Sequence, residues 1–234
     1  MFQKQPVVDY RQFRLNKLNT PEFSHLKLLG GWIVYFLMYF LTENLIPASA
    51  CHPIHCVLDD VIPFEELFVI PYVFWFFLVA GSLLNYLLYN VDYFRRLQIF
   101  IMITQAVAMI VYILYPSRQD LRPETFAHHN FLTWIVGIIY TFDTPTGVCP
   151  SLHAGYSFAI LSTLLKDREI PPFWKGVFTA VVFLICCAVC FVKQHSAVDV
   201  AAAIPMCAAA EVVVWHDWWR DRLRNPKAKR KTVL

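Results

Sequence analysis

Six apolar blocks, separated by short polar segments, constrain the fold of this chain more than any other feature. A helix needs about 20 apolar residues to cross the hydrocarbon core of a bilayer. Hydrophobic residues make up 58% of the 234 residues and charged residues 16%, against about 45–50% and about 25% in soluble domains. The sequence therefore predicts an all-α polytopic membrane protein, a bundle of six transmembrane helices at residues 28–47, 67–89, 97–115, 151–165, 173–192 and 195–216.

The blocks predict one membrane domain with two flanking segments. The six-helix membrane domain spans residues 28–216, between an N-terminal segment, residues 1–27, and a basic tail, residues 217–234. No short hydrophobic stretch with a small-residue cleavage site occurs near the start, so no removable signal peptide is expected. The apolar stretch 131–142 is too short to span. It predicts a short interfacial helix in the loop between the third and fourth membrane helices.

The distribution of positive charge predicts the orientation. Of the 20 Lys and Arg residues, all but Arg118, Arg122 and Lys193 fall on the side of the two termini. Cytoplasmic loops carry the excess of Lys and Arg. We therefore expect a multi-pass protein of the cell membrane with both termini cytoplasmic. The three exceptions lie near two unusual histidines on the opposite side, which favours an anionic ligand there.

The stretch KQHSAVDV places two ionisable residues in an apolar block. His195 and Asp199 are four residues apart, so they share one face of a helix. The carboxylate can accept the proton of one imidazole nitrogen and leave the other nitrogen as a nucleophile or base. Ionisable residues inside membrane helices are costly, which points to a function. The alternative is a structural His–Asp pair that fastens two helices.

The stretch CPSLHAGYSF predicts an anion site at the start of a helix. Ser151 is a good residue to begin a helix, and the free N–H groups of a first turn attract anions. A phosphate held there can be attacked by His195 while His153 protonates the leaving oxygen. Arg122 and Lys193 can neutralise the phosphate oxygens. For Ser151 alone, simple helix capping is the alternative.

The order of these motifs resembles the type-2 phosphatidic acid phosphatase superfamily of membrane lipid phosphatases and phosphotransferases. Its signatures are K-x6-R-P, P-S-G-H and S-R-x5-H-x3-D. The chain has R-P at 122–123, P-S-L-H at 150–153 and H-x3-D at 195–199, in the same order. The resemblance covers residues 67–210.

The resemblance implies a role for each matched residue. His195 would become a phosphohistidine, Asp199 would orient its ring, and His153 would act as the acid. Ser151 and Arg122 would hold the phosphate, and the site would use no metal or other cofactor.

The chain departs from the family pattern at three positions. Tyr115 stands where the family has a lysine, and Val189 where it has an arginine. Leu152 replaces the glycine, as in the branch that includes inositol phosphorylceramide synthases. Arg118 and Lys193 are the candidate substitutes for the two missing basic residues, although a lysine offers a point charge rather than a bidentate fork.

These observations predict a lipid phosphate phosphatase that works through a phosphohistidine on the extracytoplasmic side. Phosphatidate, phosphatidylglycerol phosphate and polyprenyl diphosphate are the substrate classes that the resemblance implies. One alternative is a head-group phosphotransferase of the sphingolipid-synthase type, with the same His/His/Asp site. Another is a non-catalytic membrane transporter or scaffold. The partners expected are the bilayer and a lipid phosphate, with no nucleic acid, and no motif encodes the lipid or the oligomeric state.

The segment Cys51-His52-Pro-Ile-His55-Cys56 admits three readings. Four Cys and His side chains can bind zinc. The two cysteines can instead form a local disulfide, since the extracytoplasmic side is oxidising in many cells. The third reading is a set of unpaired surface residues.

Overall fold

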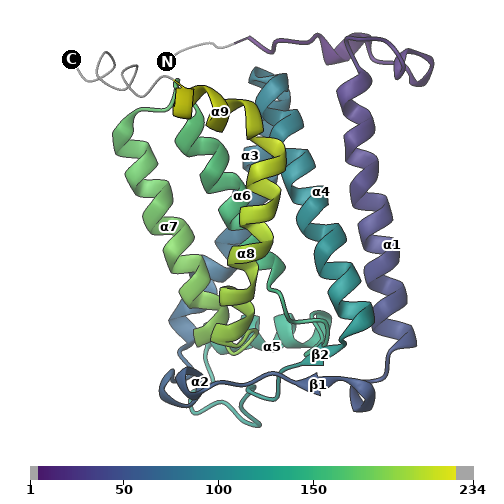
Figure 1. Ribbon diagram of the computed structural model, residues 1–234. Coiled ribbons are helices and arrows are strands. Elements are labelled where there is room, and N and C mark those ends of the chain that lie inside the picture. The colour runs from purple at the N-terminus through teal and green to yellow at the C-terminus, as the bar shows by residue number, and fades with distance from the viewer. Residues whose placement is uncertain (1–4, 225–234) are drawn as a thin grey trace.

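Six long helices of the computed structural model run between the two ends of a bundle (Figure 1). The structure describes residues 5–224, so the first four residues and the part of the predicted basic tail from 225 to 234 lie outside it. The long helices are α1 (Gly30–Leu45), α3 (Val69–Tyr89), α4 (Val91–Leu114), α6 (Leu152–Lys166), α7 (Pro172–Phe191) and α8 (Ala197–Val214).

The remaining elements are short and cover the ends of the bundle. Both ends of the described chain lie at one end of the bundle, with α9 (His216–Arg224). At the other end, which we call the histidine end, lie α2 (Val57–Val61), α5 (Phe131–Phe142), β1 (His52–Pro53) and β2 (Ser117–Arg118). Short 3-10 helices occupy Tyr10–Gln12, Leu15–Lys17, Ser24–Leu29, Ala48–Ala50 and Glu66–Phe68.

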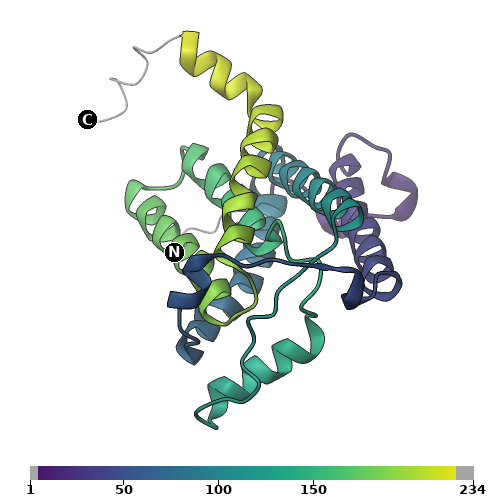
Figure 2. The same cartoon turned by 60° about the horizontal axis from the view of Figure 1, so that its bottom comes forward.

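The prediction of a mostly helical chain is confirmed. Five helical segments are long and apolar enough to cross a membrane: Ser24–Leu45, Glu66–Tyr89, Val91–Leu114, Pro172–Phe191 and Ala197–Val214. The fourth predicted span forms α6, which is shorter than these five. A helix also forms at 131–142, and it lies across the histidine end rather than along the bundle (Figures 1 and 2).

The third predicted span begins earlier than expected. Asn90 follows α3 directly, and its side chain accepts a hydrogen bond from the Tyr93 N–H, which caps α4 at Val91 rather than at residue 97. Arg95 and Arg96 therefore lie within the helix, not in the loop before it. The Arg96 guanidinium donates to the carbonyl of Val214 at 2.7 Å, which joins α4 to the end of α8.

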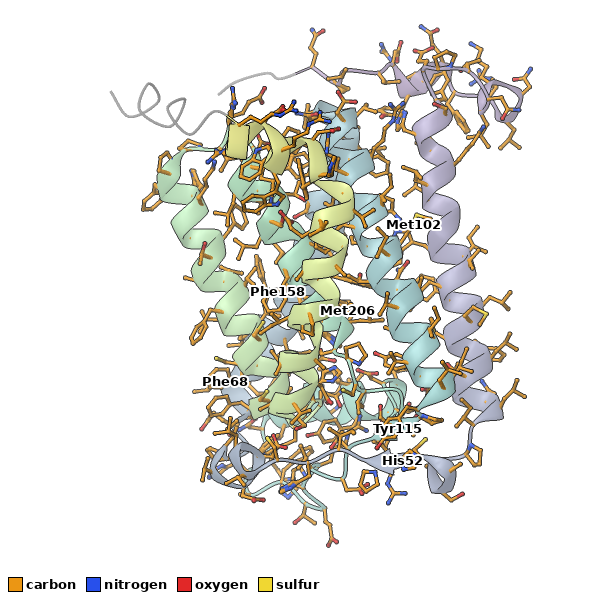
Figure 3. The ribbon with its side chains drawn as sticks, in the orientation of Figure 1. His52, Phe68, Met102, Tyr115, Phe158 and Met206 are labelled. Atoms are coloured by element: carbon orange, nitrogen blue, oxygen red, sulfur yellow. The ribbon has the colours of Figure 1, made fainter. Side chains whose placement is uncertain are left out.

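The helix α6 forms the centre of the bundle. It packs against α4, α7 and α8, and most of its residues are buried. Gly155 allows the close approach of α8, because a Cβ at this position would lie 3.0 Å from the terminal methyl group of Met206. Met206 lies midway along α8 (Figure 3). The close packing of α6 on α8 brings the starts of the two helices together at the histidine end.

A small parallel ladder organises the loops at the histidine end. His52 pairs with Ser117 and Pro53 with Arg118, and the His52 ring stacks on Tyr115 with centroids 4.4 Å apart (Figure 3). The Ser117 hydroxyl accepts the N–H groups of residues 148 and 149, at 3.2 and 3.0 Å. The ladder thus holds the loop that leads into α6.

Gly155 gives a test of this packing. Gly155→Leu places a branched side chain between α6 and α8, and overpacking of this kind costs about 1–3 kcal/mol. Gly176→Leu is the matched control, because nothing lies within 4 Å of a Cβ at that position. We expect a lower unfolding temperature in detergent for Gly155→Leu than for Gly176→Leu. Equal unfolding temperatures would contradict close packing at this point.

Candidate functional site

The start of α8 carries a buried histidine–carboxylate pair. Ser196 caps the helix, and the carboxylate of Asp199 accepts the Ser196 N–H at 2.9 Å, which completes a capping box. The same carboxylate oxygen lies 3.2 Å from Nδ1 of His195. Asp199 has 0% of its surface exposed and His195 has 7%. The carboxylate therefore holds the proton on Nδ1, and Nε2 keeps its lone pair.

The second histidine lies directly against the first. His153, at the first turn of α6, has Nδ1 3.2 Å from Nε2 of His195. The two ring centroids are 5.3 Å apart. Trp75 and Tyr72 of α3 pack on the His153 ring, with centroids at 4.3 and 4.9 Å. His153, His195 and Asp199 thus form one hydrogen-bonded row that opens at the His153 side.

Ser151 takes the position of a helix cap. Its hydroxyl accepts the N–H of Ala154 at 3.4 Å, and its own N–H donates to the carbonyl of Asp199 at 3.0 Å. The side chain is fully buried and does not line the cavity described below. Ser151 therefore ties the start of α6 to the start of α8, and this placement matches the capping alternative.

Arg122 lies near the histidines but behind a neighbouring glutamine. Its guanidinium donates to Gln194 Oε1 at 2.5 Å and to the carbonyls of Asp143 and Tyr140 at 2.6 and 3.2 Å. The guanidinium also lies over the Tyr140 ring, 4.4 Å from its centroid. These contacts occupy the two terminal nitrogens of the guanidinium, whereas the buried Nε has no hydrogen-bond partner among the described residues.

Lys193 and Arg118 also face protein oxygen atoms. The Lys193 ammonium donates to the carbonyls of Ile62 and Asp59, at 2.5 and 3.1 Å. Its backbone has φ of 55°, a left-handed conformation that costs a residue other than glycine about 1–2 kcal/mol. Arg118 binds Asp120 at 3.1 Å and the carbonyl of Ala48 at 3.0 Å. The structure places both cations in structural contacts and not beside the two histidines.

Asp59, on the short helix α2, is a site residue that the motifs did not reveal. One of its carboxylate oxygens accepts the Ser196 hydroxyl at 2.5 Å and the Cys56 N–H at 2.8 Å. The other accepts the Ala197 N–H at 2.9 Å. Asp59 therefore occupies the anion position at the N-terminus of α8. Together with Lys193, it clamps both sides of His195.

The pKa of the Asp59 carboxyl group is set by two opposing effects, its burial and its hydrogen bonds. Burial raises the pKa of the carboxyl group, but the donors from Ser196, Ala197 and Cys56 lower the pKa by more, so the net shift is downward. A carboxyl group with a lowered pKa in the folded state stabilises the fold above its unfolded pKa. That contribution is lost as the pH falls through the folded pKa.

A cavity of about 700 Å³ opens beside the two histidines. Its walls come from α1, α3, α4, α5, α6 and the loops before α6 and α8, and ten of the lining residues are Phe, Tyr or Trp. Asp143 lines the cavity, and its carboxylate accepts the Tyr72 hydroxyl at 3.0 Å and the Gln194 amide at 3.2 Å. Within residues 5–224, no Lys or Arg side chain lines this cavity. Its aromatic lining includes Trp32, Tyr35, Tyr39, Tyr72, Trp75 and Tyr156.

The Cys/His segment of the first loop does not form a ligand cluster. His52 stacks on Tyr115, and His55 binds Asp60 at 2.7 Å. Cys51 and Cys56 are both free thiols. In the part of the chain that the structure describes, no group of three or more Cys, His, Asp or Glu side chains is placed to hold a metal ion.

Comparison with known proteins gives no match for this chain. No protein-family model matches the chain, and neither the curated proteins nor the solved structures include a match. The class of protein is therefore defined by its own features. Over residues 5–224, it is a helical chain with five helices long and apolar enough to cross a membrane and a hydrogen-bonded His–His–Asp row beside an apolar cavity.

The Asp59 clamp yields a prediction on stability and pH. Asp59→Asn removes the charge and leaves one donor of the α8 start unsatisfied, which costs about 1–3 kcal/mol. Asp60→Asn is the matched control, since Asp60 lies on the surface and surface changes stay within about 0.5 kcal/mol. Thermal unfolding in detergent measures both variants.

The pH dependence sharpens this test. The wild type should lose stability as the pH falls below about 4, the ordinary range of a carboxyl group, and Asp59→Asn should lose less over the same range. The clamp would be contradicted if the Asp59 and Asp60 variants were equally stable at neutral pH.

Proposed function

We propose that this chain is an integral membrane enzyme that removes phosphate from a lipid through a phosphohistidine at His195. One observation carries the proposal: the buried carboxylate of Asp199 lies 3.2 Å from Nδ1 of His195, beside the cavity. A carboxylate in this position favours the proton on Nδ1 and leaves the lone pair on Nε2. An imidazole oriented in this way is a nucleophile. The order of the motifs, which resembles the type-2 phosphatidic acid phosphatases, supports the same assignment.

The reaction takes two balanced steps. The substrate phosphate displaces the hydrogen bond between the two imidazoles, and Nε2 of His195 attacks the phosphorus. The N–P bond forms, the P–O bond to the lipid breaks, and the protonated His153 gives its proton to the leaving oxygen. In the second step His153 takes a proton from water, and the hydroxyl attacks the phosphorus. The N–P bond breaks, phosphate leaves, and the lone pair returns to Nε2.

The same proposal places the protein in the cell membrane with six membrane helices. The surplus of Lys and Arg on the side of the termini supports a cytoplasmic position for both ends. The helix α6 packs between α4, α7 and α8, and these neighbours shield it from lipid. Its central position supports counting it as a membrane span in addition to the five longer ones, which makes six. The apolar helix α5 would lie in the interface on the extracytoplasmic side, next to the active site.

A second candidate function is a head-group phosphotransferase that passes the phosphoryl group to a lipid hydroxyl. The charge of the cavity favours it. A phosphomonoester carries about −1.5 to −2 at neutral pH, and burying such charge is costly without paired cations. The described lining contains no Lys or Arg, and Arg122 and Lys193 are held by protein oxygens. A phosphodiester, with a single negative charge, suits this cavity better.

Turnover by site variants tests the proposal. Purified protein in detergent is given a panel of lipid phosphates and phosphodiesters, with and without acceptor lipids. We expect His195→Ala to lower turnover by at least about 10³-fold and Asp199→Asn by about 10²-fold or more, since a nucleophile and its orienting group act as a unit. His216→Ala, at the other end of the bundle, is the control and should keep wild-type turnover.

The pattern of products decides between the candidates. Phosphate release without an acceptor identifies a phosphatase, and product that requires a lipid hydroxyl identifies a transferase. Unchanged turnover in His195→Ala would overturn both. A wild type that processes no lipid of the panel would instead favour the non-catalytic alternative.

A further inference from the structure

The cavity extends away from the histidines along one face of α3. The α3 residues that line it follow each other at intervals of three and one, which places them on a single helix face. They are Tyr72, Trp75, Phe76, Val79, Ala80 and Leu83. The lining residues of α1, from Trp32 to Tyr39, repeat the same spacing and form the opposite wall. The cavity is therefore a groove between α1 and α3, and one end of it lies at the imidazoles of His153 and His195.

The groove is open toward the side of the bundle. α1 packs on α4, and none of its residues is fully buried; Figure 1 places it at the edge of the bundle. Phe36 and Phe76 line the groove from opposite walls, yet they are 59% and 52% exposed. The two walls thus leave a lateral mouth between them.

Both ends of α1 are fixed, so the mouth is a stable feature of the fold. At the histidine end Glu43 accepts the hydroxyls of Thr144 and Thr146, which belong to the loop beside the cavity. Toward the other end, the Trp32 indole donates to Gln98 of α4 at 3.1 Å. Trp32 also contacts Tyr156 edge-on, with centroids 5.6 Å apart, and so closes the floor of the groove.

The depth of the groove matches one leaflet of a bilayer. From Tyr72 to Leu83, α3 rises about 16 Å at 1.5 Å per residue. The hydrocarbon core of a bilayer is about 30 Å thick, so half of it is about 15 Å. The α3 side of the groove begins near the histidines and ends at Leu83, about two thirds of the way along the helix. Its length and apolar lining fit a hydrocarbon chain anchored by a head group at the histidine end.

We propose that this groove binds one acyl chain of a membrane lipid, which enters sideways between α1 and α3 from the leaflet at the histidine end. Ala80 and Leu83 contact the distal part of the chain, and Trp32 limits its length. The identity of the head group at the imidazoles rests on the proposed function, whereas the chain site is tested apart from it.

A photoreactive lipid tests the chain site without any need for turnover. The probe is a phosphatidate with a diazirine near the end of one acyl chain, in phosphatidylcholine vesicles that contain the full-length protein. We expect the label on α3 around Ala80–Leu83 and on α1 around Trp32–Phe36. Ala80→Phe fills the groove and should reduce this labelling about tenfold, which corresponds to about 1.4 kcal/mol. Gly81→Phe is the matched control, since nothing lies within 4 Å of a Cβ there.

A second variant guards against misfolding. Should Ala80→Phe unfold at a lower temperature than Gly81→Phe, Leu83→Phe narrows the same groove at its deeper end and should reduce the label in the same way. Equal labelling of the groove-filling variants and Gly81→Phe would overturn the proposal. So would labelling confined to outward positions such as Phe77 and Leu84, or cross-links between two copies of the chain across α1 and α3.

The two proposals fail separately. Groove labelling that persists in His195→Ala, in a protein that processes no lipid, would leave the chain site standing and remove the enzymatic assignment. The opposite pair of results is lipid turnover that depends on His195 and groove labelling that Ala80→Phe does not reduce. It would leave the enzymatic assignment standing and remove the chain site.

Discussion

The buried carboxylate of Asp199 is the constraint on which the rest of the site depends. A carboxylate with no exposed surface is costly unless hydrogen bonds offset its burial. One oxygen of Asp199 has no hydrogen-bond partner among the described residues, and the other accepts from two donors, Nδ1 of His195 and the N–H of Ser196. The first fixes the ring of the histidine, and the second fixes the start of α8. The carbonyl of the same residue accepts the N–H of Ser151, so the start of α6, and with it His153, is positioned by one residue.

A second set of contacts holds this arrangement from outside. Asp59 and Lys193 tie α2 to both sides of His195, and Arg122 supports Gln194, the residue before it. The charged side chains of Asp59, Lys193 and Arg122 stabilise the site through hydrogen bonds to other protein groups. The cavity beside His195 is therefore left with little positive charge. Under the proposed function, the lipid would bind there mainly through its hydrocarbon chain against the aromatic lining rather than through its phosphate charge.

The sequence predicted what depends on composition and local spacing, and missed what depends on distant partners. Apolar blocks predicted the helices, and the four-residue spacing predicted the pairing of His195 with Asp199. The two residues do not share a helix face, however, because His195 precedes α8, which begins at Ala197. Lys193 donates to the carbonyls of Asp59 and Ile62, which precede it by 134 and 131 residues in the sequence, so no local pattern could show that the lysine is occupied. Asp143 gave no signal beyond its place after an apolar stretch. The early start of α4 was missed because Arg95 and Arg96 suggested a loop, whereas the Asn90 cap decides the boundary.

Trapping the covalent intermediate tests the central claim most directly. The protein is mixed with a lipid substrate labelled in its phosphate, quenched in alkali, in which a phosphohistidine survives, and digested for mass spectrometry. The account predicts phosphate on the peptide that contains His195, and on no peptide of the His195→Ala variant. Lipid turnover with phosphate on another residue, or with no covalent phosphate at any time after mixing, would contradict it.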